Sequence, residues 1–425
     1  MEMQMELQPQ PHVLLLPFPA QGHIKPMLAL AQLLCHSGIH VTFLNTEHNH
    51  RQLTQRQALS GRFPTLHFHS ISDGLPSDHP RSVYSNYMDI ITSLRSKMAP
   101  LLHQLLVSLM SKNDVDDPVA QLPPLGCVIT DGIMSFAIDV AEELRIPVIA
   151  LRFISAASFL CNLCIPKLIE EAQLPFGVLS HIGSLFSKVY TIGPLHALLK
   201  SHIVDNNLSS SSAAAASLRQ EDRRCMMWLD SQSVGSVIFV SFGSLLKLTR
   251  VQLLEFWHSL VNSGFPFLWV IWSDVLWSDE AEHLSYVIPG ELETATKERG
   301  FIVDWAPQEE VLAHEAMGGF LTHSGWNSTL EAMWAGVPMR CWPQIGDQQV
   351  NSRWVGEVWK IGIDMKDTCD RSTIEKMIKA LMKGEERDVI SRSVDRFAKL
   401  ARTSVSESGS SYHNLEKLIE DLRNL

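Results

Sequence analysis

The sequence lacks any long apolar stretch, and its hydrophobic runs, such as Val13–Leu16, have the length of a single strand. A membrane-spanning helix needs about 20 apolar residues in a row, and no segment approaches this length. The first residues, Met1–Glu6, are polar and acidic, whereas a secretory leader has a basic start and an apolar core. We therefore expect a cytoplasmic protein with no membrane span.

Basic residues are also in short supply. The chain has 35 Lys and Arg against 46 Asp and Glu, which gives a formal net charge of -11. This balance argues against nucleic acid as a partner, because nonspecific nucleic-acid binding needs a basic face. Cysteine is scarce as well, with 7 among 425 residues. We expect the cysteines to remain thiols in a reducing compartment and to form no zinc site.

What the sequence does contain is an alternation of short apolar runs and segments with helical spacing. In the first half, strands are predicted at His12–Pro17 and Val41–Leu44, and a helix at Pro26–Leu34 after a break at Gly22. Further strands are predicted at Cys127–Thr130, Pro147–Leu151, Val237–Val240, Phe267–Ile271, Phe301–Val303 and Gly319–His323. Further helices are predicted after Asp131, at Val251–Leu260 and at Trp326–Trp334. Such strand–helix–strand units build parallel sheets, so the fold class is α/β.

A low-complexity stretch, Ser209–Ser217, separates two halves that each open with a strand, a Gly-containing loop and a helix. We therefore expect two doubly wound, Rossmann-like domains facing a cleft, with ligands beyond the carboxyl ends of the strands. The predicted organisation is an N-terminal domain over 1–205, a linker over 206–221, a C-terminal domain over 222–405, and a C-terminal helix over 406–425 that packs back on the N-terminal domain.

The most informative stretch is Trp305–Gln348, which reads WAPQEEVLAHEAMGGFLTHSGWNSTLEAMWAGVPMRCWPQIGDQ. It resembles the signature box of plant secondary-product glycosyltransferases in its opening Trp-x-Pro-Gln, its His-Ser-Gly-Trp-Asn-Ser core, the Glu that follows, Gly-Val-Pro and the closing Asp-Gln. The chain is thus similar to the plant family-1 UDP-glycosyltransferases over nearly its whole length. This resemblance implies a GT-B fold, in which the N-terminal domain binds the acceptor and the C-terminal domain binds the UDP-sugar.

Residues of the box also make chemical sense by themselves. Asn327 and Ser328 fall in the first turn of a predicted helix, where unpaired amides and the helix dipole attract a diphosphate. His323, at the end of the preceding strand, can donate to the same phosphates. Trp305 offers a flat indole for stacking on uracil, a contact worth about 1–3 kcal/mol. The carboxylate of Glu331 can accept hydrogen bonds from both ribose hydroxyls.

The resemblance implies a complete donor site. In the family, the position of Ala306 reads the uracil edge through its backbone, and the closing pair Asp347 and Gln348 binds the sugar hydroxyls. A closing Gln favours glucose over galactose. The implied UDP-sugar site consists of Ser241, Ser244, Trp305, Ala306, Gln308, His323, Trp326, Asn327, Ser328, Glu331, Asp347 and Gln348.

The catalytic pair is predicted in the N-terminal half. His23 follows Gly22 at the entry to the first helix, and the pKa of an unperturbed imidazole suits a general base. Asp131 ends its predicted strand and can orient the imidazole and stabilise its charged form. In the family, these positions deprotonate the acceptor for a single displacement that inverts the anomeric carbon. The resemblance implies UDP-glucose as co-substrate and no metal or other cofactor.

The sequence departs from the family pattern in three places. The segment 177–188 is much shorter than in the family, so we expect a damaged acceptor pocket and reduced activity. Trp272 stands where the family usually has Arg beside the donor site. Arg152 and Phe153 replace a Trp-Thr pair near the sugar, which removes a hydroxyl contact and predicts weaker sugar binding.

The predicted function is transfer of glucose to a hydroxyl or carboxylate of a small plant metabolite by a monomeric enzyme. The runs Gln21–Leu28 and Asp367–Thr373 look closest to the iridoid branch, the 7-deoxyloganetic acid glucosyltransferases, so an iridoid monoterpenoid is the expected acceptor. One alternative is a weakly active or inactive isoform that binds UDP-sugar or a full-length sibling. Another is a nucleotide-sugar epimerase, which would use buried carboxylates instead of the His–Asp pair.

Overall fold

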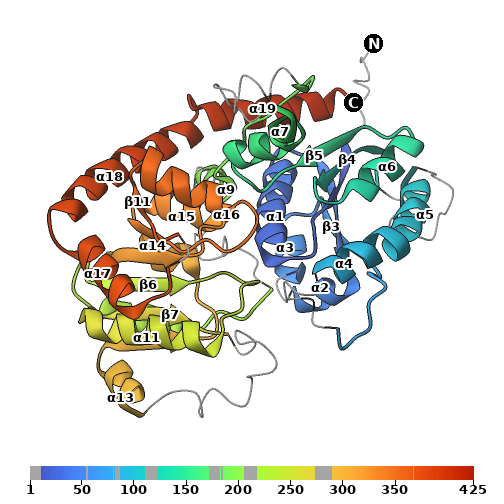
Figure 1. Cartoon of the computed structure of the whole chain (residues 1–425). Helices are drawn as coiled ribbons and strands as arrows, with labels where there is room; N and C mark the ends of the chain where they lie inside the picture. Colours follow the sequence, from blue (N-terminus) through green and yellow to red (C-terminus); the bar gives the residue numbers. More distant parts are fainter. Residues whose placement is uncertain are drawn as a thin grey trace. The chain divides into compact units, whose positions relative to one another are not determined.

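A computed structural model gives the structure of the chain. It describes residues 11–53, 56–79, 81, 87–110, 122–171, 182, 185–204, 218–272, 290–366 and 368–425. The chain forms two compact units (Figure 1). The N-terminal unit comprises residues 1–153, 190–218 and 405–425, and the C-terminal unit comprises 154–189 and 219–404. Most of the predicted linker and most of the predicted short segment 177–188 lie outside the described residues.

The units differ from the predicted domain boundaries in one segment. Residues 154–189 group with the C-terminal unit, and Ser158 in their helix α7 (Ala156–Glu171) lies 3.4 Å from Asn351 Oδ1. The final helix α19 (Ser410–Arg423) belongs to the N-terminal unit, where Asn414 Nδ2 donates to Thr191 Oγ1 at 2.8 Å. The other boundaries stay a prediction.

Within the described residues, the N-terminal unit contains a five-stranded sheet in the order β3-β2-β1-β4-β5. Its strands are β1 (His12–Leu16), β2 (His40–Thr46), β3 (Leu66–Ile71), β4 (Leu125–Asp131) and β5 (Val148–Leu151). All neighbouring strands are parallel, which confirms the strand predictions for this half. Because β1 pairs with β4 in the register Leu16↔Thr130, the residues that follow both strands meet at one edge of the sheet.

Helices cover both faces of this sheet. They are α1 (Gln21–His36), α2 (Glu47–Gln52), α3 (Arg56–Arg62), α4 (Tyr87–Ser93), the π-helix η2 (Leu94–Met98), α5 (Ala99–Met110), α6 (Ser135–Glu143), α9 (Leu195–Val204) and α19. One face is packed by α4, η2, α5 and α6, which bury residues such as Leu102 and Phe136 against Leu14 and Val128. Helix α1 contacts β1, β2, β3 and α9.

The predicted start of the first helix is wrong by five residues. Helix α1 begins at Gln21 with Ala20 as its N-cap, and it contains both Gly22 and Pro26. Glycine keeps its backbone N–H and costs a helix only about 1 kcal/mol relative to alanine, so Gly22 does not end the helix. The consequence is functional, because His23 lies in the first turn of α1 and its amide bonds to the Ala20 carbonyl at 2.9 Å.

The C-terminal unit contains, within the described residues, a six-stranded sheet in the order β11-β10-β9-β6-β7-β8. Its strands are β6 (Val237–Ser241), β7 (Phe267–Val270), β8 (Gly300–Val303), β9 (Met317–Thr322), β10 (Met339–Cys341) and β11 (Gly362–Asp364). All neighbouring strands are again parallel. The strand predictions for this half are confirmed within one or two residues at each end.

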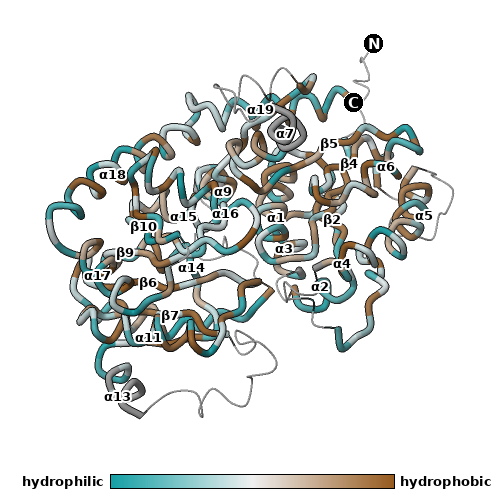
Figure 2. Tube along the Cα trace, viewed as in Figure 1, coloured by the Kyte–Doolittle hydropathy of each residue, from teal (hydrophilic) through white to brown (hydrophobic). Residues whose placement is uncertain are grey.

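The core of this unit explains its continuous apolar runs. Side chains alternate between the two faces of a strand, and in β6 Ile238 and Val240 enter one hydrophobic cluster while Val237 and Phe239 enter the other. A strand that is covered on both faces has no polar side, so it appears in the sequence as an unbroken hydrophobic run. Figure 2 shows the hydrophobic residues concentrated along such strands.

Two layers of helices produce these clusters. Helices α11 (Arg250–Ser263) and α17 (Arg371–Met382) pack on one face. The other face is covered by α10 (Arg224–Asp230), α14 (Gln308–Ala313), α15 (Trp326–Ala335) and α18 (Glu385–Val405). The remaining helices are α7, α13 (Gly290–Arg299), α16 (Gln348–Arg353) and the π-helix η6 (Trp354–Val358). None of the helices in the described part of the chain has the length and hydrophobicity needed to cross a bilayer.

One residue contradicts the apolar rule. Arg340, in the middle of β10, is 1% exposed, and its three guanidinium nitrogens have no hydrogen-bond partner among the described residues. It pairs in register with Leu321 of β9, so it points to the cluster formed by α11 and α17. Burial lowers the pKa of this guanidinium to about 10, although the charge of Glu386 acts in the opposite direction.

We expect Arg340→Met to raise the free energy of unfolding by about 1–3 kcal/mol, because an unsatisfied buried polar group costs this much and more when charged. Methionine keeps the unbranched apolar stem and removes the guanidinium. Chemical denaturation monitored by tryptophan fluorescence measures the change. The matched control is Arg392→Met on the exposed side of α18, which should alter stability by less than about 0.5 kcal/mol. A loss of stability in Arg340→Met would contradict the assignment.

Candidate functional site

In the N-terminal unit, the structure brings the predicted catalytic pair into contact. His23, in the first turn of α1, places Nδ1 2.5 Å from Oδ2 of Asp131, the last residue of β4. Asp131 is 1% exposed, and its carboxylate also accepts hydrogen bonds from the amides of Ile133 at 3.1 Å and Phe18 at 3.4 Å. A carboxylate only accepts, so Nδ1 of His23 is the donor and Nε2 carries the lone pair. This is the arrangement of an oriented base.

Aromatic rings and a guanidinium surround this pair. The rings of Phe18 and Phe153 meet the His23 imidazole edge-on, with centroids at 5.3 and 5.6 Å. Arg152, which follows β5, lies against Gly132, since a Cβ placed on that glycine would come within 2.2 Å of Arg152 Nε. Arg152 and Phe153, noted in the sequence as departures, therefore border the predicted base.

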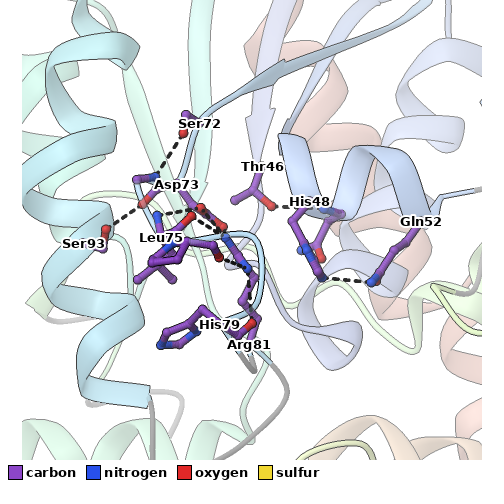
Figure 3. Close-up of polar contacts among 12 residues, drawn as sticks. Thr46, His48, Gln52, Ser72, Asp73, Leu75, His79, Arg81 and Ser93 are labelled. Atoms are coloured by element: carbon purple, nitrogen blue, oxygen red, sulfur yellow. Dashed lines mark hydrogen bonds and ion pairs between the residues drawn. The ribbon is translucent and has the colours of Figure 1, made fainter.

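A second polar cluster at the same edge of the sheet was missed by the sequence analysis (Figure 3). Arg81 pairs with Asp73 in the loop after β3, with Nε–Oδ2 and Nη2–Oδ1 distances of 2.7 and 3.0 Å. Arg81 also donates to the carbonyls of Leu75, Pro76 and His79. Burial alone would raise the pKa of the Asp73 carboxyl, but the hydrogen bonds and charge of Arg81 hold it below its usual range.

This ion pair fixes the shape of the loop from Ser72 to Arg81. The signal in the sequence was weak, because the two charges lie eight positions apart and only turn residues such as Gly74 and Pro76 mark the segment between them. Figure 3 also shows His48 beside this loop, where it pairs with Gln52 at 2.9 Å. Desolvation, followed by the charge of Arg81, lowers the pKa of His48.

In the C-terminal unit, His323 follows β9 directly and lies between two glycines. A Cβ added at Gly243 or Gly325 would come within 2.6 or 2.5 Å of its Nε2. Nδ1 of His323 is buried and has no hydrogen-bond partner among the described residues. Loss of hydration on burial lowers the pKa of His323 to about 4. The imidazole is therefore neutral near pH 7 and offers a single N–H.

The strand ends around His323 carry the other predicted phosphate contacts. Ser241 ends β6 and pairs in register with Thr322 of β9, so it lies beside the His323 turn. Ser244 follows Gly243, whose φ of 77° places it in the left-handed region that favours glycine. The family resemblance had implied both serines, whereas strand spacing alone had not. Their positions after a strand put them at the same edge as His323.

Helix α15 begins at Trp326, and its N-cap Gly325 provides no side-chain cap. The first-turn amides, which belong to Trp326, Asn327 and Ser328, therefore have no capping side chain at Gly325, as a diphosphate site requires. The ring of Trp326 lies 6.4 Å from that of Trp359, and the predicted part of its side chain in the site stays a prediction. The sequence predicted the helix start correctly.

Gln308, Ser328 and Glu331 form a small network. Gln308 Nε2 donates to Ser328 Oγ at 3.0 Å and to Glu331 Oε2 at 2.7 Å. All three side chains come from the facing helices α14 and α15. The predicted ribose ligands Gln308 and Glu331 are thus held together, and their hydrogen bond fixes the direction of the carboxylate.

Trp305 has a neighbour that the sequence did not reveal. The guanidinium carbon of Arg219 lies 5.4 Å from the Trp305 ring centroid and 4.7 Å from that of Trp272. Both distances are typical of cation–π contacts. Ala306 is buried next to Trp305. Trp272, noted as a departure from the family, is therefore accompanied by a cation from another segment, and a base stacked on the same indole face would have to displace it.

The predicted sugar ligands lie at the start of α16. Asp347 is the N-cap of this helix, and its Oδ2 accepts a hydrogen bond from Asn351 Nδ2 at 2.7 Å. Gln348 Oε1 accepts from the amides of Gln344 and Ile345 at 2.8 and 3.0 Å. Since its oxygen is used by the loop, Gln348 presents its amide nitrogen as a donor. Within the described residues, no group of His, Cys, Asp and Glu is arranged to hold a metal ion.

Two family profiles match this chain, one in its first half and one in its second half. A family profile described as "Glycosyltransferase, N-terminal domain" matches residues 10–173, and one described as "UDP-glucoronosyl and UDP-glucosyl transferase" matches residues 201–393. The 7-deoxyloganetic acid glucosyltransferase of Catharanthus roseus is 41% identical and covers 98% of both chains. The mogroside I-A1 synthase of Siraitia grosvenorii is 43% identical over 93% of this chain and 86% of its own length.

Solved structures show the same fold. Os79 from O. sativa, in complex with UDP, superposes with a TM-score of 0.79 at 26% identity, covering 96% of this chain and all of its own. UGT73P12 of Glycyrrhiza uralensis, with glycyrrhetinic acid 3-O-monoglucuronide, gives a TM-score of 0.78 at 22% identity, covering 98% of this chain and 96% of its own. The two parallel-sheet units thus form a GT-B fold.

The predicted loss of activity from a shortened segment is not supported. The alignment with the Catharanthus roseus enzyme runs over 482 positions, more than the 425 residues of this chain. The shorter length therefore appears as gaps inside a match that spans 98% of both chains. The inactive-isoform alternative depended on the same argument and loses its support. This chain belongs to the UDP-glucoronosyl and UDP-glucosyl transferase family and is similar to its plant glycosyltransferases.

Proposed function

We propose that this chain is an inverting glycosyltransferase that moves glucose from UDP-glucose to a hydroxyl or carboxylate of a small plant metabolite. The observation that carries the proposal is the 2.5 Å contact between His23 Nδ1 and Asp131 Oδ2. It leaves Nε2 as a proton acceptor with a fixed tautomer, which is what an acceptor hydroxyl requires. Membership of the family supports the UDP-sugar as donor.

The reaction is a single displacement. The acceptor oxygen forms a bond to C1 of glucose while the bond between C1 and the UDP oxygen breaks. A hydroxyl acceptor gives its proton to Nε2 of His23, whereas a carboxylate acceptor attacks already deprotonated, and in both cases the electron pair of the broken bond leaves with the diphosphate. Asp131 stabilises the imidazolium that forms, because its carboxylate is buried and stays hydrogen-bonded to Nδ1. Attack opposite the leaving group inverts the configuration at C1.

The C-terminal unit holds the donor in this proposal. The first-turn amides of α15 and the single N–H of neutral His323 stabilise the diphosphate, and Ser241 and Ser244 add hydroxyl donors from the β6 loop. The indole of Trp305 stacks on uracil, and the Ala306 backbone meets its edge. The proposed ribose and sugar ligands are Gln308, Glu331, Asp347 and Gln348.

The acceptor is proposed to be an iridoid monoterpenoid that carries a carboxylate. The supporting observation is Arg152, whose guanidinium lies beside Gly132 and therefore next to the Asp131–His23 pair. A planar guanidinium matches a carboxylate through two parallel hydrogen bonds. The loop from Ser72 to Arg81, fixed by its ion pair with Asp73, is proposed to line the same acceptor region.

Turnover with UDP-glucose and a panel of iridoid acids, terpenoid alcohols and flavonoids tests this function, with products detected by mass. We expect transfer of one hexose, fastest with an iridoid acid. Arg152→Met should raise KM about tenfold for acids, the size of a lost charged hydrogen bond, and leave KM for neutral acceptors unchanged. No transfer to any acceptor would contradict the function, and an equal effect on neutral acceptors would contradict the role of Arg152.

The donor assignment predicts losses in UDP affinity that calorimetry can measure. Trp305→Ala should weaken binding roughly 5- to 100-fold by removing the stack, and Glu331→Ala should weaken it about tenfold by removing the ribose acceptor. The matched control is Glu310→Ala. Glu310 also lies on α14, but its carboxylate pairs with Arg223 at the surface. Unchanged affinity in both variants would refute the site.

The base assignment predicts a loss of turnover without a loss of donor affinity. His23→Ala should lower kcat by a factor of about 10²–10⁴, the usual contribution of general base catalysis. Asp131→Asn should also lower kcat, because the amide cannot stabilise the imidazolium. His103→Ala, a surface histidine of the same unit, serves as control. Wild-type turnover by His23→Ala would remove this residue from the mechanism.

A further inference from the structure

Asn351 of α16 lies at the centre of a buried polar network. Its side chain is 1% exposed, and Nδ2 donates to Asp347 Oδ2 at 2.7 Å and to the Ser324 carbonyl at 3.0 Å. An amide nitrogen carries two hydrogens, so this one amide uses both of them. One bond reaches a proposed sugar ligand, and the other reaches the loop of the proposed diphosphate site.

The Ser324 contact supports an unusual backbone. Ser324 has a φ of 64°, a left-handed conformation that non-glycine residues adopt at a cost and that persists only where its surroundings impose it. It stands between His323 and Gly325, the N-cap of α15. The hydrogen bond from Asn351 to its carbonyl therefore holds the turn that sets both His323 and the first amides of α15.

The network also includes helix α7. Ser158 Oγ lies 3.4 Å from Asn351 Oδ1 and 3.5 Å from the Asp347 carbonyl. Ser155 accepts a hydrogen bond from the Ser158 amide at 3.1 Å and so caps the first turn of α7. The oxygen of the Asn351 amide is thereby given a partner, and all polar atoms of this buried side chain have contacts.

We propose that Asn351 is a positioning residue. It couples the carboxylate of Asp347, the proposed sugar ligand, to the turn at Ser324 beside the proposed diphosphate site. It acts through these two groups and does not touch the donor. The inference rests on the proposed function of the donor site. Aspartate could not replace it, because a second carboxylate would face Asp347 and the Ser324 carbonyl, and alanine would remove both of these hydrogen bonds.

Calorimetry with UDP and with UDP-glucose tests this coupling in the full chain. Asp347→Ala should weaken UDP-glucose binding about tenfold, the loss of a charged hydrogen bond, and leave UDP binding unchanged. Asn351→Ala should weaken both ligands, and UDP-glucose by a further factor of about five to ten. In the double variant Asp347→Ala/Asn351→Ala, the additional loss of UDP-glucose affinity should vanish, because the effects of residues that act through one another are not additive.

The outcomes separate the possible roles of Asn351. An Asn351→Ala protein with lower thermal stability and unchanged affinity for both ligands would overturn the proposal, as would additive effects in the double variant. If Asn351→Ala does not fold, Ser158→Ala replaces it, and a loss of the sugar-specific factor in that variant supports the network. Arg353→Ala, on an exposed part of the same helix, is the control. A wild-type chain that does not bind UDP would instead refute the donor site itself.

Discussion

The parallel pairing of the strands is the constraint on which the rest of the structure depends. A parallel sheet places all its carboxyl ends at one edge, and in each unit the candidate residues follow or end strands at that edge. Asp131 ends β4 and His23 follows β1 in the N-terminal unit. His323 and Asp347 follow β9 and β10 in the C-terminal unit. Residues far apart in sequence therefore meet at this edge of their sheet.

The proposed donor site is organised by hydrogen bonds within the protein. Gln308 fixes the Glu331 carboxylate, and Asn351 fixes the Asp347 carboxylate. A carboxylate whose direction is set in advance loses little conformational freedom on binding a hydroxyl. The position of His323 is also set within the protein, because the imidazole packs against Gly325 and Gly243, where any Cβ would meet it.

The sequence allowed most of the described strands to be predicted, because doubly covered strands are unbroken apolar runs, but β3, β10 and β11 were not predicted. The proposed donor box could be named because it is contiguous in the sequence. The sequence did not allow the contacts between distant segments to be predicted. Arg219 lies over Trp305, and Ser158 reaches Asn351, but side-chain pairs of this separation leave no periodic signal. For the same reason residues 154–189 were assigned to the N-terminal domain, although they group with the C-terminal unit. The buried Arg340 departs from its strand's apolar pattern, and its lack of a partner could only be seen in the structure.

The proposed reaction is a single displacement at C1 by an acceptor that His23 activates. The anomeric configuration of the product tests it most directly, because UDP-glucose carries the α configuration and one displacement must reverse it. Proton NMR of the purified glucoside distinguishes the two anomers through the coupling between H1 and H2. We expect a β-glucoside as the sole product. An α-glucoside would mean retention through two displacements or attack from the leaving-group face, and it would contradict the mechanism.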